Sequence, residues 1–576
     1  MKNNKIPIVY IVFFLAFLTI FGAFLFLSVY KPKEYFNPYI KKLESALRGD
    51  IVTKNFTLVK SDRIYAVYLD PDYIAHTKRN LFIDLFSIYT GINRKTIAQK
   101  LHTHQRTLLA IVDKKTKQQL IYLRRILDKY RVFLSVNGIR RGYDIESVIL
   151  KNINGNLVFS PLFRRFYPYK DIFEPYLGSY SKEKERGNNG IEEYYDNILR
   201  PGRNGVIKGF RDVGGHIIYD KNAYVKYPQN GKTLKLNINL VLQKRIEKLL
   251  DKAKSKFQAD EVIAAVMDSK SGKILALASS NRFDPNHITQ KDIPNMKISA
   301  VRELFEPGSV MKPITFAILL ENNKVNPYEV LNAYNGKWKP EWRKTPIRDD
   351  EARQWISAED GIVYSSNIVL SQLALRLSAK EQFYGYRKFG LDKISGIDLP
   401  YELKGRLQPL KLYNYPVYKS TSAYGYGIVV NFVELLKAYN VFNNNGIMVT
   451  PKIADIKTDS KQIIKPVTAN EMLRILRKVV LKGTAKGAFI DDIFTAGKTG
   501  TAHVSIKGSY QKIYNSSFFG FANANGKKFT IGVTFFHIKA PFPNYFASQS
   551  AVPLFKNIVI IMKDEKMFGG KDEGNN

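Results

Sequence analysis

Three short stretches are the most informative part of this chain: Ser309-Val-Met-Lys312, Ser365-Ser-Asn367 and Lys498-Thr-Gly500. In this order, an S-x-x-K, an S-x-N and a K-T-G string supply a nucleophile with its base, a pair of proton-relay groups, and a strand that binds a carboxylate. Each string alone is uninformative, because the chain also holds S-x-x-K at Ser179 and at Ser509. The order of the three strings and their local context together predict a site for acyl transfer.

The first string lies where a turn meets a helix. Glu306-Pro-Gly308 reads as the turn, and the apolar run from Ile314 to Leu320 continues as the helix. The start of a helix presents unpaired backbone N–H groups that can receive an oxyanion. Lys312 follows Ser309 by one helical turn, so its amine can lie on the same face as the hydroxyl. A serine needs an adjacent base, and a lysine can serve when burial and nearby cations lower its pKa.

The second string falls between two predicted helices. Ser357 and Asp360 form a capping-box pattern that begins the first helix, and apolar residues from Val369 to Leu377 mark the second. Short polar side chains at such a junction can point into a cleft, which predicts roles for Ser365 and Asn367. Taken in isolation, the string favours an ordinary N-cap pair instead.

The third string reads as a strand of small residues, from Ala496 to Ala502. Glycines in a strand permit the close approach of another backbone or a ligand. Lys498, Thr499 and Thr501 would bind a substrate carboxylate there, while backbone N–H groups face the scissile carbonyl. A Gly-rich edge strand without function is the alternative, and the other two strings argue against it.

The chain divides by composition. At 576 residues it is too long for a single core, so two or three globular units are expected. Residues 6–30 carry no charge and are long enough for a membrane-spanning helix, with residues 1–5 as a short cytoplasmic tail. A buried core helix is the alternative, and no small-x-small cleavage site follows the run. We expect a non-catalytic pedestal over residues 31–230, a catalytic domain over 231–562, and a flexible tail over 563–576.

Local patterns predict an α+β catalytic domain. Val262–Met267 and Lys273–Ala278 flank a turn, and Ser517–Ala522 and Lys528–Phe535 flank Asn525-Gly526. The domain opens with Leu234–Asn239, and an amphipathic helix follows, with Leu242, Ile246, Leu249 and Leu250 on one face. Strands at both ends with helices between them indicate an antiparallel sheet flanked by helices.

Composition limits the chemistry. The chain has no cysteine, which excludes disulfides and thiolate nucleophiles. His102 and His104 have no acidic cluster near them, so no metal site is expected, and no cofactor. The net charge of +38 suits anionic surfaces, although a lysine-rich background explains it equally well. A nucleic-acid partner is excluded if the residues after the apolar run lie outside the cytoplasm.

Further stretches carry a resemblance to a family. Glu306-Pro-Gly-Ser-Val-Met-Lys-Pro313 resembles the E-P-G-S-x-x-K-P form of the septal branch of class B penicillin-binding proteins. Gly190-Ile-Glu-Glu-Tyr-Tyr-Asp196 resembles the signature that ends their pedestal, or dimerisation, domain. Tyr424-Gly-Tyr-Gly427 is similar to a segment of their transpeptidase domain. The usual R-G-x-I-x-D-R-N-G and L-T-I-D strings are altered at Arg48–Phe56 and Leu236–Asn239, which weakens the assignment to a branch rather than the chemistry.

The resemblance implies a D,D-transpeptidase that cross-links peptidoglycan stem peptides through an acyl-enzyme on Ser309. Lys312 would be the base, and β-lactams would acylate the same serine. The implied roles of the remaining residues are proton transfer and substrate positioning for Ser365 and Asn367, carboxylate binding for Lys498, Thr499, Gly500 and Thr501, and an oxyanion hole from the N–H groups of Ser309 and Thr501.

The resemblance also implies partners and a location. The substrates would be stem peptides and their lipid-linked precursor, and the partners a SEDS-type glycosyltransferase and other division proteins. The protein would be a single-pass protein of the bacterial inner membrane, with its catalytic domain in the periplasm. The alternatives are an elongation-type transpeptidase, a β-lactamase or D,D-carboxypeptidase, and a non-catalytic β-lactam sensor.

Overall fold

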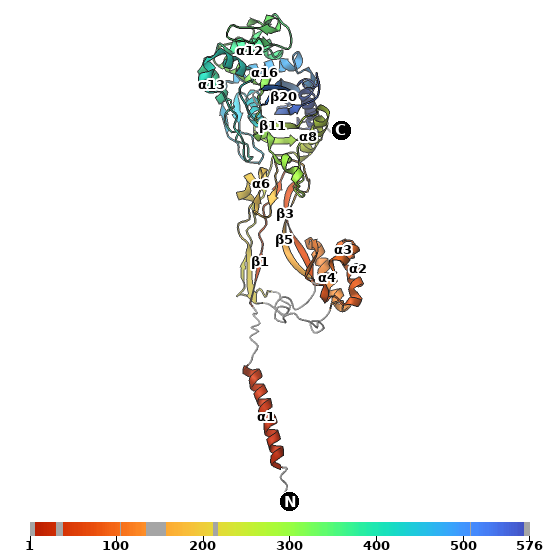
Figure 1. Cartoon of the computed structure of the whole chain (residues 1–576). Helices are drawn as coiled ribbons and strands as arrows, with labels where there is room; N and C mark the ends of the chain where they lie inside the picture. The colour runs from red at the N-terminus through yellow and green to blue at the C-terminus, as the bar shows by residue number, and fades with distance from the viewer. Residues whose placement is uncertain are drawn as a thin grey trace, which may run out of the picture. The chain divides into compact units, whose positions relative to one another are not determined.

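A computed structural model describes residues 6–29, 39–103, 105–133, 157–210, 217–506 and 509–569 (Figure 1). The chain divides into two compact units. The first comprises residues 1–46 and 201–230, and the second comprises residues 47–200 and 231–576. His104 lies outside the described residues.

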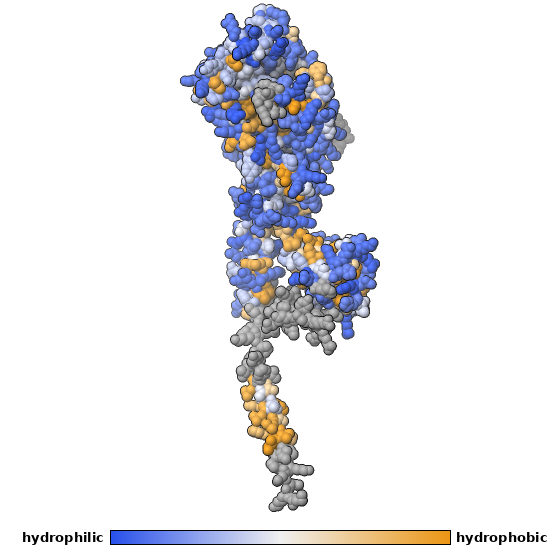
Figure 2. Space-filling view, viewed as in Figure 1, coloured by the Kyte–Doolittle hydropathy of each residue, from blue (hydrophilic) through white to orange (hydrophobic). Residues whose placement is uncertain are grey.

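The first unit contains one helix and a small sheet. Helix α1 (Ile6–Val29) has apolar, exposed side chains from Tyr10 to Leu25, which appear orange in Figure 2. Strands β1 (Tyr39–Glu44), β8 (Gly205–Phe210) and β9 (Tyr224–Lys226) pair in that order, all antiparallel. Among the described residues, none of the helices combines the length and the apolar character that crossing a membrane requires.

The second unit begins with a mixed sheet. Its order is β10 (Leu234–Lys235), β2 (Ile51–Val52), β3 (Thr57–Leu69) and β4 (Thr107–Val112), with β5 (Val158–Phe166) also paired to β3. Helices α2 (Arg79–Thr90), α3 (Arg94–Lys100) and α4 (Lys114–Lys129) share a separate core with this sheet.

The segment expected to open the catalytic domain pairs with the pedestal sheet instead. Leu234–Asn239 was assigned to the catalytic domain, but β10 pairs in parallel with β2 of the pedestal sheet, Leu234 opposite Ile51. Its residue pattern indicates a strand and cannot specify the partner, because both candidate neighbours are apolar. The segment also reaches the catalytic domain: Leu236 bridges to Ala454, the Asn237 N–H donates to the Ile453 carbonyl at 2.7 Å, and the Asn239 N–H donates to the Leu275 carbonyl at 2.8 Å.

The catalytic sheet is antiparallel, as predicted. Its order is β12 (Ile274–Ser279), β11 (Glu261–Asp268), β21 (Lys527–Ile538), β20 (Ser509–Ala524) and β19 (Phe494–Ile506). Both expected hairpins are confirmed, and Asn525 and Gly526 both have positive φ, as a two-residue hairpin turn requires. Strand β19 is an edge strand, so one side of it is available to other elements.

Helices cover both faces of this sheet because neighbouring strand residues point to opposite sides. Phe518 packs on Phe555 of α17 (Ala551–Asp564), whereas Phe519 packs on Phe432 of α15 (Phe432–Asn443). Helix α8 (Leu240–Phe257) contacts α17, β11 and β12, and α16 (Pro466–Leu481) contacts α15 and β19. The predicted stripe of α8 is confirmed at Leu242, Ile246 and Leu250, which are fully buried; Leu249 is only half-buried.

The remaining elements are short. They are β6 (Tyr180–Ser181), β7 (Arg186–Gly187), α6 (Gly190–Tyr194), α7 (Asp196–Leu199), α9 (Ser299–Arg302), η5 (Gly308–Met311), α10 (Lys312–Glu321), β13 (Val330–Asn332), η6 (Tyr334–Gly336), β14 (Lys337–Trp338), β15 (Ile347–Arg348), β16 (Trp355–Ser357), α11 (Ala358–Val363), α12 (Asn367–Ala374), α13 (Ala379–Lys388), α14 (Pro416–Ala423), β17 (Ile447–Val449) and β18 (Ser460–Gln462), with short 3-10 turns over Pro71–Tyr73, His76–Lys78, Gln290–Met296, Leu410–Asn414 and Lys486–Ala488.

The C-terminal boundary differs from the prediction. A flexible tail was expected from residue 563, but α17 continues to Asp564 and Phe568 is buried against Phe529, with ring centroids 5.4 Å apart. The polar composition of this stretch conceals one aromatic anchor. Residues 570–576 lie outside the described residues.

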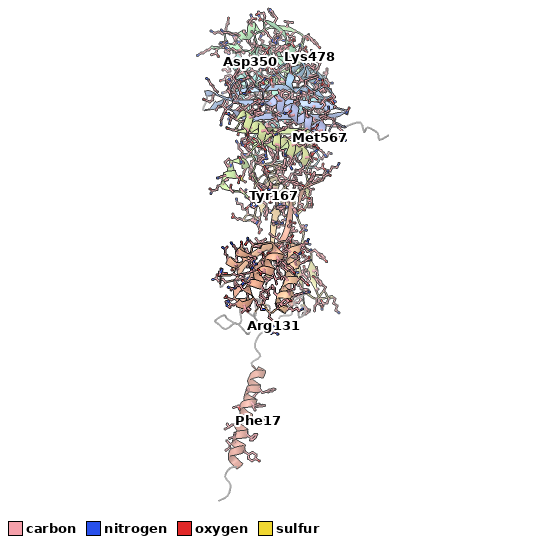
Figure 3. All side chains as sticks on the ribbon, turned by 90° about the vertical axis from the view of Figure 1, so that its right-hand side faces the viewer. Phe17, Arg131, Tyr167, Asp350, Lys478 and Met567 are labelled. Atoms are coloured by element: carbon pink, nitrogen blue, oxygen red, sulfur yellow. The ribbon has the colours of Figure 1, made fainter. Side chains whose placement is uncertain are left out.

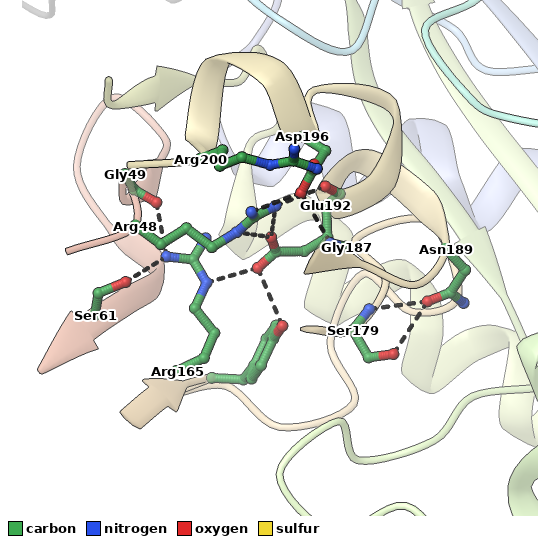
Figure 4. A network of polar contacts seen from close by, with 11 residues as sticks. Arg48, Gly49, Ser61, Arg165, Ser179, Gly187, Asn189, Glu192, Asp196 and Arg200 are labelled. Carbon is green, nitrogen blue, oxygen red and sulfur yellow. Dashed lines mark hydrogen bonds and ion pairs between the residues drawn. The ribbon is translucent and has the colours of Figure 1, made fainter. Parts of the chain in front are cut away.

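A buried ion network lies at the end of the pedestal sheet (Figure 4). The Glu192 carboxylate accepts from Arg48 at 2.9 Å, from Arg165 at 2.7 Å and from the Tyr167 hydroxyl at 3.0 Å. Arg48 also donates to Asp196 at 2.7 Å. The altered Arg48–Phe56 stretch and the Gly190–Asp196 stretch therefore meet here, as partners in one ion network that also includes Arg200.

Candidate active site

The nucleophile candidate lies on a turn that two glycines make possible. Ser309 is partly exposed on η5, and the Lys312 N–H donates to the Ser309 carbonyl. Gly308 has a φ of +59° and donates its N–H to the Gly425 carbonyl at 3.1 Å. A Cβ on Gly425 would lie 2.1 Å from the Gly308 oxygen. The Tyr424–Gly427 segment thus packs against the backbone of the turn that holds Ser309.

The K-T-G strand packs directly on this turn. A Cβ on Gly500 would lie 2.9 Å from the Val310 Cγ1 atom and 3.1 Å from the Pro307 oxygen, so only glycine permits the approach. On the other side of η5, the Tyr439 hydroxyl donates to the Val310 carbonyl at 2.5 Å. The first and third strings, 186 residues apart between Lys312 and Lys498, are neighbours in the fold.

Ser365 joins the two lysines. The Lys312 ammonium nitrogen lies 3.1 Å from the Ser365 hydroxyl and also donates to the Ser365 carbonyl. The Lys498 nitrogen lies 2.9 Å from the same hydroxyl. Ser365 adopts a φ of +63°, which is uncommon for a residue other than glycine. The fold therefore brings one residue from each of the three strings into a single hydrogen-bonded cluster.

The electrostatics of the cluster favour a neutral amine. Lys312 and Lys498 are both fully buried, which disfavours the charged form of each. Burial lowers the pKa of Lys312 to about 8, against the opposing pull of Asp349 and Asp350. The pKa of Lys498 is lowered well below its ordinary value by burial and by the neighbouring Lys312, again opposed by Asp350. A lysine in this state can accept a proton close to neutral pH.

The residues of the second string have different structural roles. Ser366 is the N-cap of α12: its hydroxyl accepts from the Val369 N–H at 3.0 Å and donates to Asp349 at 2.5 Å. The N-cap reading thus holds for Ser366, while Ser365 faces the lysines. The Asn367 amide donates to the Arg348 carbonyl at 2.8 Å and is not hydrogen-bonded to the lysine cluster. The sequence did not predict a role for Asp349, because it belongs to a charged run that resembles a solvated loop.

The hydroxyls of the third string have protein partners. Thr499 is buried and lies 2.7 Å from the Thr484 hydroxyl, oxygen to oxygen. Thr501 is partly exposed, and its hydroxyl accepts from the Ala547 N–H at 3.2 Å. Of the three residues predicted to bind substrate, Thr499 and Thr501 are positioned by other side chains or backbone, and Gly500 provides the close contact with η5.

Known proteins share this architecture. The family described as "Penicillin binding protein transpeptidase domain" matches residues 262–559, and "Penicillin-binding Protein dimerisation domain" matches residues 43–236. The probable peptidoglycan D,D-transpeptidase PenA of Neisseria gonorrhoeae is 28% identical over 410 residues, covering 70% of this chain and 69% of PenA. The peptidoglycan D,D-transpeptidase FtsI of Buchnera aphidicola is 26% identical over 569 residues, covering 95% and 94%.

A solved structure agrees at the level of the fold. Penicillin Binding Protein 2X from Streptococcus thermophilus superposes with a TM-score of 0.71 at 18% identity, covering 93% of this chain and 83% of that one. Transpeptidase and dimerisation domains in one chain, together with the three assembled strings, define a penicillin-sensitive transpeptidase. The chain belongs to the class B penicillin-binding proteins.

Proposed function

We propose that this enzyme cross-links peptidoglycan through an acyl-enzyme on Ser309. The observation that carries the proposal is the lysine cluster: two buried lysines share the Ser365 hydroxyl beside the turn that holds Ser309. A buried amine with a pKa of about 8 is a suitable base for a serine, which is a weak nucleophile by itself.

In the first half-reaction, Lys312 takes the Ser309 proton as the oxygen attacks the carbonyl between two terminal D-alanines. The N–H groups of Ser309 and Thr501 stabilise the oxyanion. The carbon–nitrogen bond then breaks, and the leaving D-alanine amine receives a proton through the Ser365 hydroxyl. Lys498, Thr499 and Thr501 hold the terminal carboxylate, and Asn367 holds the substrate amide. A β-lactam is opened by the same attack.

In the second half-reaction, an amine of a neighbouring stem peptide attacks the ester. Its proton passes to the cluster, and the Ser309 hydroxyl is regenerated. Water in place of the amine would make the enzyme a D,D-carboxypeptidase or a β-lactamase. The match of residues 43–236 to the dimerisation-domain family supports the transferase, since β-lactamases and D,D-carboxypeptidases usually lack such a lobe.

The direct test is product analysis. The full chain in detergent is incubated with a stem peptide ending in D-Ala-D-Ala and with an amine acceptor, and the products are separated by mass. Transpeptidation predicts an acceptor-linked product and released D-alanine, both absent with Ser309→Ala. Hydrolysed donor without acceptor-linked product would favour the carboxypeptidase, and no turnover with intact β-lactam binding would favour the sensor.

The biological role we propose is septal wall synthesis during cell division. The support is the Glu306–Pro313 string and the similarity to a relative named FtsI. The alternative is elongation. Depletion in the native cell distinguishes the two: filaments with unclosed septa are expected for a septal enzyme, and rounded cells would contradict this role.

We also propose that residues 6–30 anchor the protein in the inner membrane, with the catalytic domain in the periplasm. The proposal rests on the uncharged, apolar composition of the sequence in this run and not on α1, which does not meet the requirements for a span. Partners of the SEDS glycosyltransferase type and other division proteins are part of the same proposal. Membrane fractionation of the full chain and of a chain lacking residues 1–38 tests the anchor: the shortened chain should be released.

A further inference from the structure

One short segment contains all three tryptophans of the chain. Trp338, Trp342 and Trp355 lie between β13 and the start of α11, in the green segment beyond α12 in Figure 1. Tyr334 stacks on Trp338 with ring centroids 5.8 Å apart and planes at 15°, and Trp342 meets Trp338 edge-on at the same separation. We call Tyr334, Trp338 and Trp342 the aromatic platform. Tyr334 is 41% exposed, and both tryptophans are partly exposed.

A strained turn presents the platform. Tyr334, Asn335 and Gly336 have φ values of +50°, +47° and +77°, a run of three left-handed residues. A bulky residue with positive φ is rare, and such strain concentrates at binding sites. The Gly336 carbonyl accepts from the Asp349 N–H at 3.1 Å, which ties the turn to the far strand of the segment.

The platform is linked to both sides of the candidate active site. On one side, the Asp349 carboxylate accepts from the Ser366 hydroxyl at 2.5 Å and from the Asn367 N–H at 2.6 Å. On the other side, Arg343 donates to the Tyr424 hydroxyl at 3.1 Å, beside the Gly425 that supports the Ser309 turn. Figure 3 labels Asp350, which follows Asp349 in the chain.

The segment that carries the platform, residues 334–355, has more basic than acidic side chains, with Glu341, Asp350 and Glu351 also exposed. Lys337, Lys339 and Lys344 are exposed, and none makes an ion pair within the part of the chain that the structure describes. Arg348 is exposed as well. Aromatic rings beside unpaired cations match a ligand that offers apolar faces and carboxylates together.

We propose that the aromatic platform binds the glycan strand that carries the stem peptide, so that the sugar is held while its peptide occupies the cleft. The C–H faces of pyranose rings stack on aromatic side chains. The lysines face carboxylates of the stem peptides, or the lactyl carboxylates of those muramic acid residues that carry no peptide. The inference rests on the proposed function, because the peptide in the cleft is covalently joined to such a strand. It adds a second binding site for the same polymer outside the catalytic residues.

Two soluble probes separate stacking from charge. The first is a neutral chitin tetrasaccharide, and the second is a peptide-free peptidoglycan strand, which carries lactyl carboxylates. Calorimetric titration of the full chain in detergent gives the Kd for each. Trp338→Ala and Tyr334→Ala should weaken both probes by at least about tenfold. A variant with Lys337, Lys339 and Lys344 all changed to Gln should weaken only the strand, by about three- to tenfold, and more at low salt.

The controls keep the outcome unambiguous. Trp355 lies outside the platform, so the Trp355→Phe variant should bind both probes like the parent. The tryptophan fluorescence of this variant comes from Trp338 and Trp342 alone and should change on binding. Acylation by fluorescent penicillin, which carries no sugar, should be unchanged in every variant. Unchanged Kd values in Trp338→Ala and Tyr334→Ala, or a parent that binds neither probe, would overturn the proposal. A parent protein that fluorescent penicillin does not acylate would instead contradict the proposed function.

Discussion

At the scale of single residues, the central feature is one hydroxyl shared by two buried lysines. Ser365 accepts hydrogen bonds from Lys312 and Lys498, and burial lowers the pKa of both amines. Two positive charges cannot be held so close together in a buried site without cost. The cluster therefore favours loss of a proton, which is what a base for Ser309 requires.

The pKa of Lys312 predicts a pH dependence for acylation. The reactive form is the neutral amine, so the rate should rise with pH and level off above about 8. At pH 7 about one tenth of Lys312 would be neutral, and at pH 8 about one half. The rate of fluorescent penicillin labelling between pH 5.5 and 9.5 measures this. Lys312→Arg should lose about 10²–10⁴-fold in rate and the rising limb with it; a flat profile in the parent would exclude Lys312 as the base.

Ser365 offers a matched pair of substitutions. Ser365→Ala and Ser365→Gly both remove the hydroxyl, so both should reduce the acylation rate by about 10²-fold or more. Glycine adopts a positive φ without strain and alanine does not, so Ser365→Gly should be the more stable of the two variants by about 1 kcal/mol. Thermal unfolding and penicillin labelling separate the effects. Equal activity in the parent and in both variants would mean that the hydroxyl carries no proton.

Sequence patterns predicted these residues unevenly. The strings singled out Ser309, Lys312, Ser365 and Lys498 by their spacing and order, and the fold brings Lys312, Ser365 and Lys498 together; the catalytic role of all four stays a prediction. They could not predict that Asn367 would donate to Arg348, or that Thr501 would accept from Ala547, because those partners depend on loops far away in the chain. Asp349 carries no local signal at all, since a run of acidic residues on a loop has no fixed partner.

At the scale of elements, the contact between η5 and β19 is what assembles the site. The edge position of β19 leaves room for the serine turn, and Gly500 allows the two backbones to approach. Alternation along β20 places Phe518 and Phe519 on opposite faces, which fixes α17 on one side of the sheet and α15 on the other. The sheet and its hairpins were predictable from period-two patterns and turn residues. The pairing of β10 with the pedestal was not.

Gly500→Ala should test this contact. The added methyl group would lie 2.9 Å from Val310 Cγ1 and must displace η5, so the acylation rate should fall by at least about tenfold. Gly526→Ala is the control, because no atom lies within 4 Å of its added Cβ and only the positive φ of the turn is strained. That variant should lose some stability and keep its labelling rate. Equal labelling in the two variants would refute the role of the contact.

The ion network at the end of the pedestal sheet predicts a large effect on stability. Glu192→Gln would leave Arg48 and Arg165 buried without their shared carboxylate, at a cost of about 3–5 kcal/mol. Asp62→Asn removes the solvent-accessible pairs with Lys60 and Arg164 and should cost no more than about 1 kcal/mol. Thermal unfolding of the two variants beside the parent measures the difference. A small shift for Glu192→Gln would mean that the arginines find other partners.

At the scale of the whole molecule, length and composition excluded some kinds of fold and chemistry but did not specify the fold. Length predicted more than one unit, and the absence of cysteine excluded thiol chemistry. The unit that joins residues 1–46 with 201–230 could not be predicted, because strand pairing between distant segments leaves no periodic signal within either one. The predicted flexible tail was too long, since one buried phenylalanine in a polar stretch escapes a compositional argument.

The measurement that most directly tests the central claim is the mass of the intact protein after reaction with benzylpenicillin, followed by peptide mapping. If Ser309 is the nucleophile, we expect one penicilloyl group per chain, on the peptide that contains Ser309, and none on Ser309→Ala. An adduct on Ser365 or on any other residue, or one that persists in the Ser309→Ala variant, would contradict it.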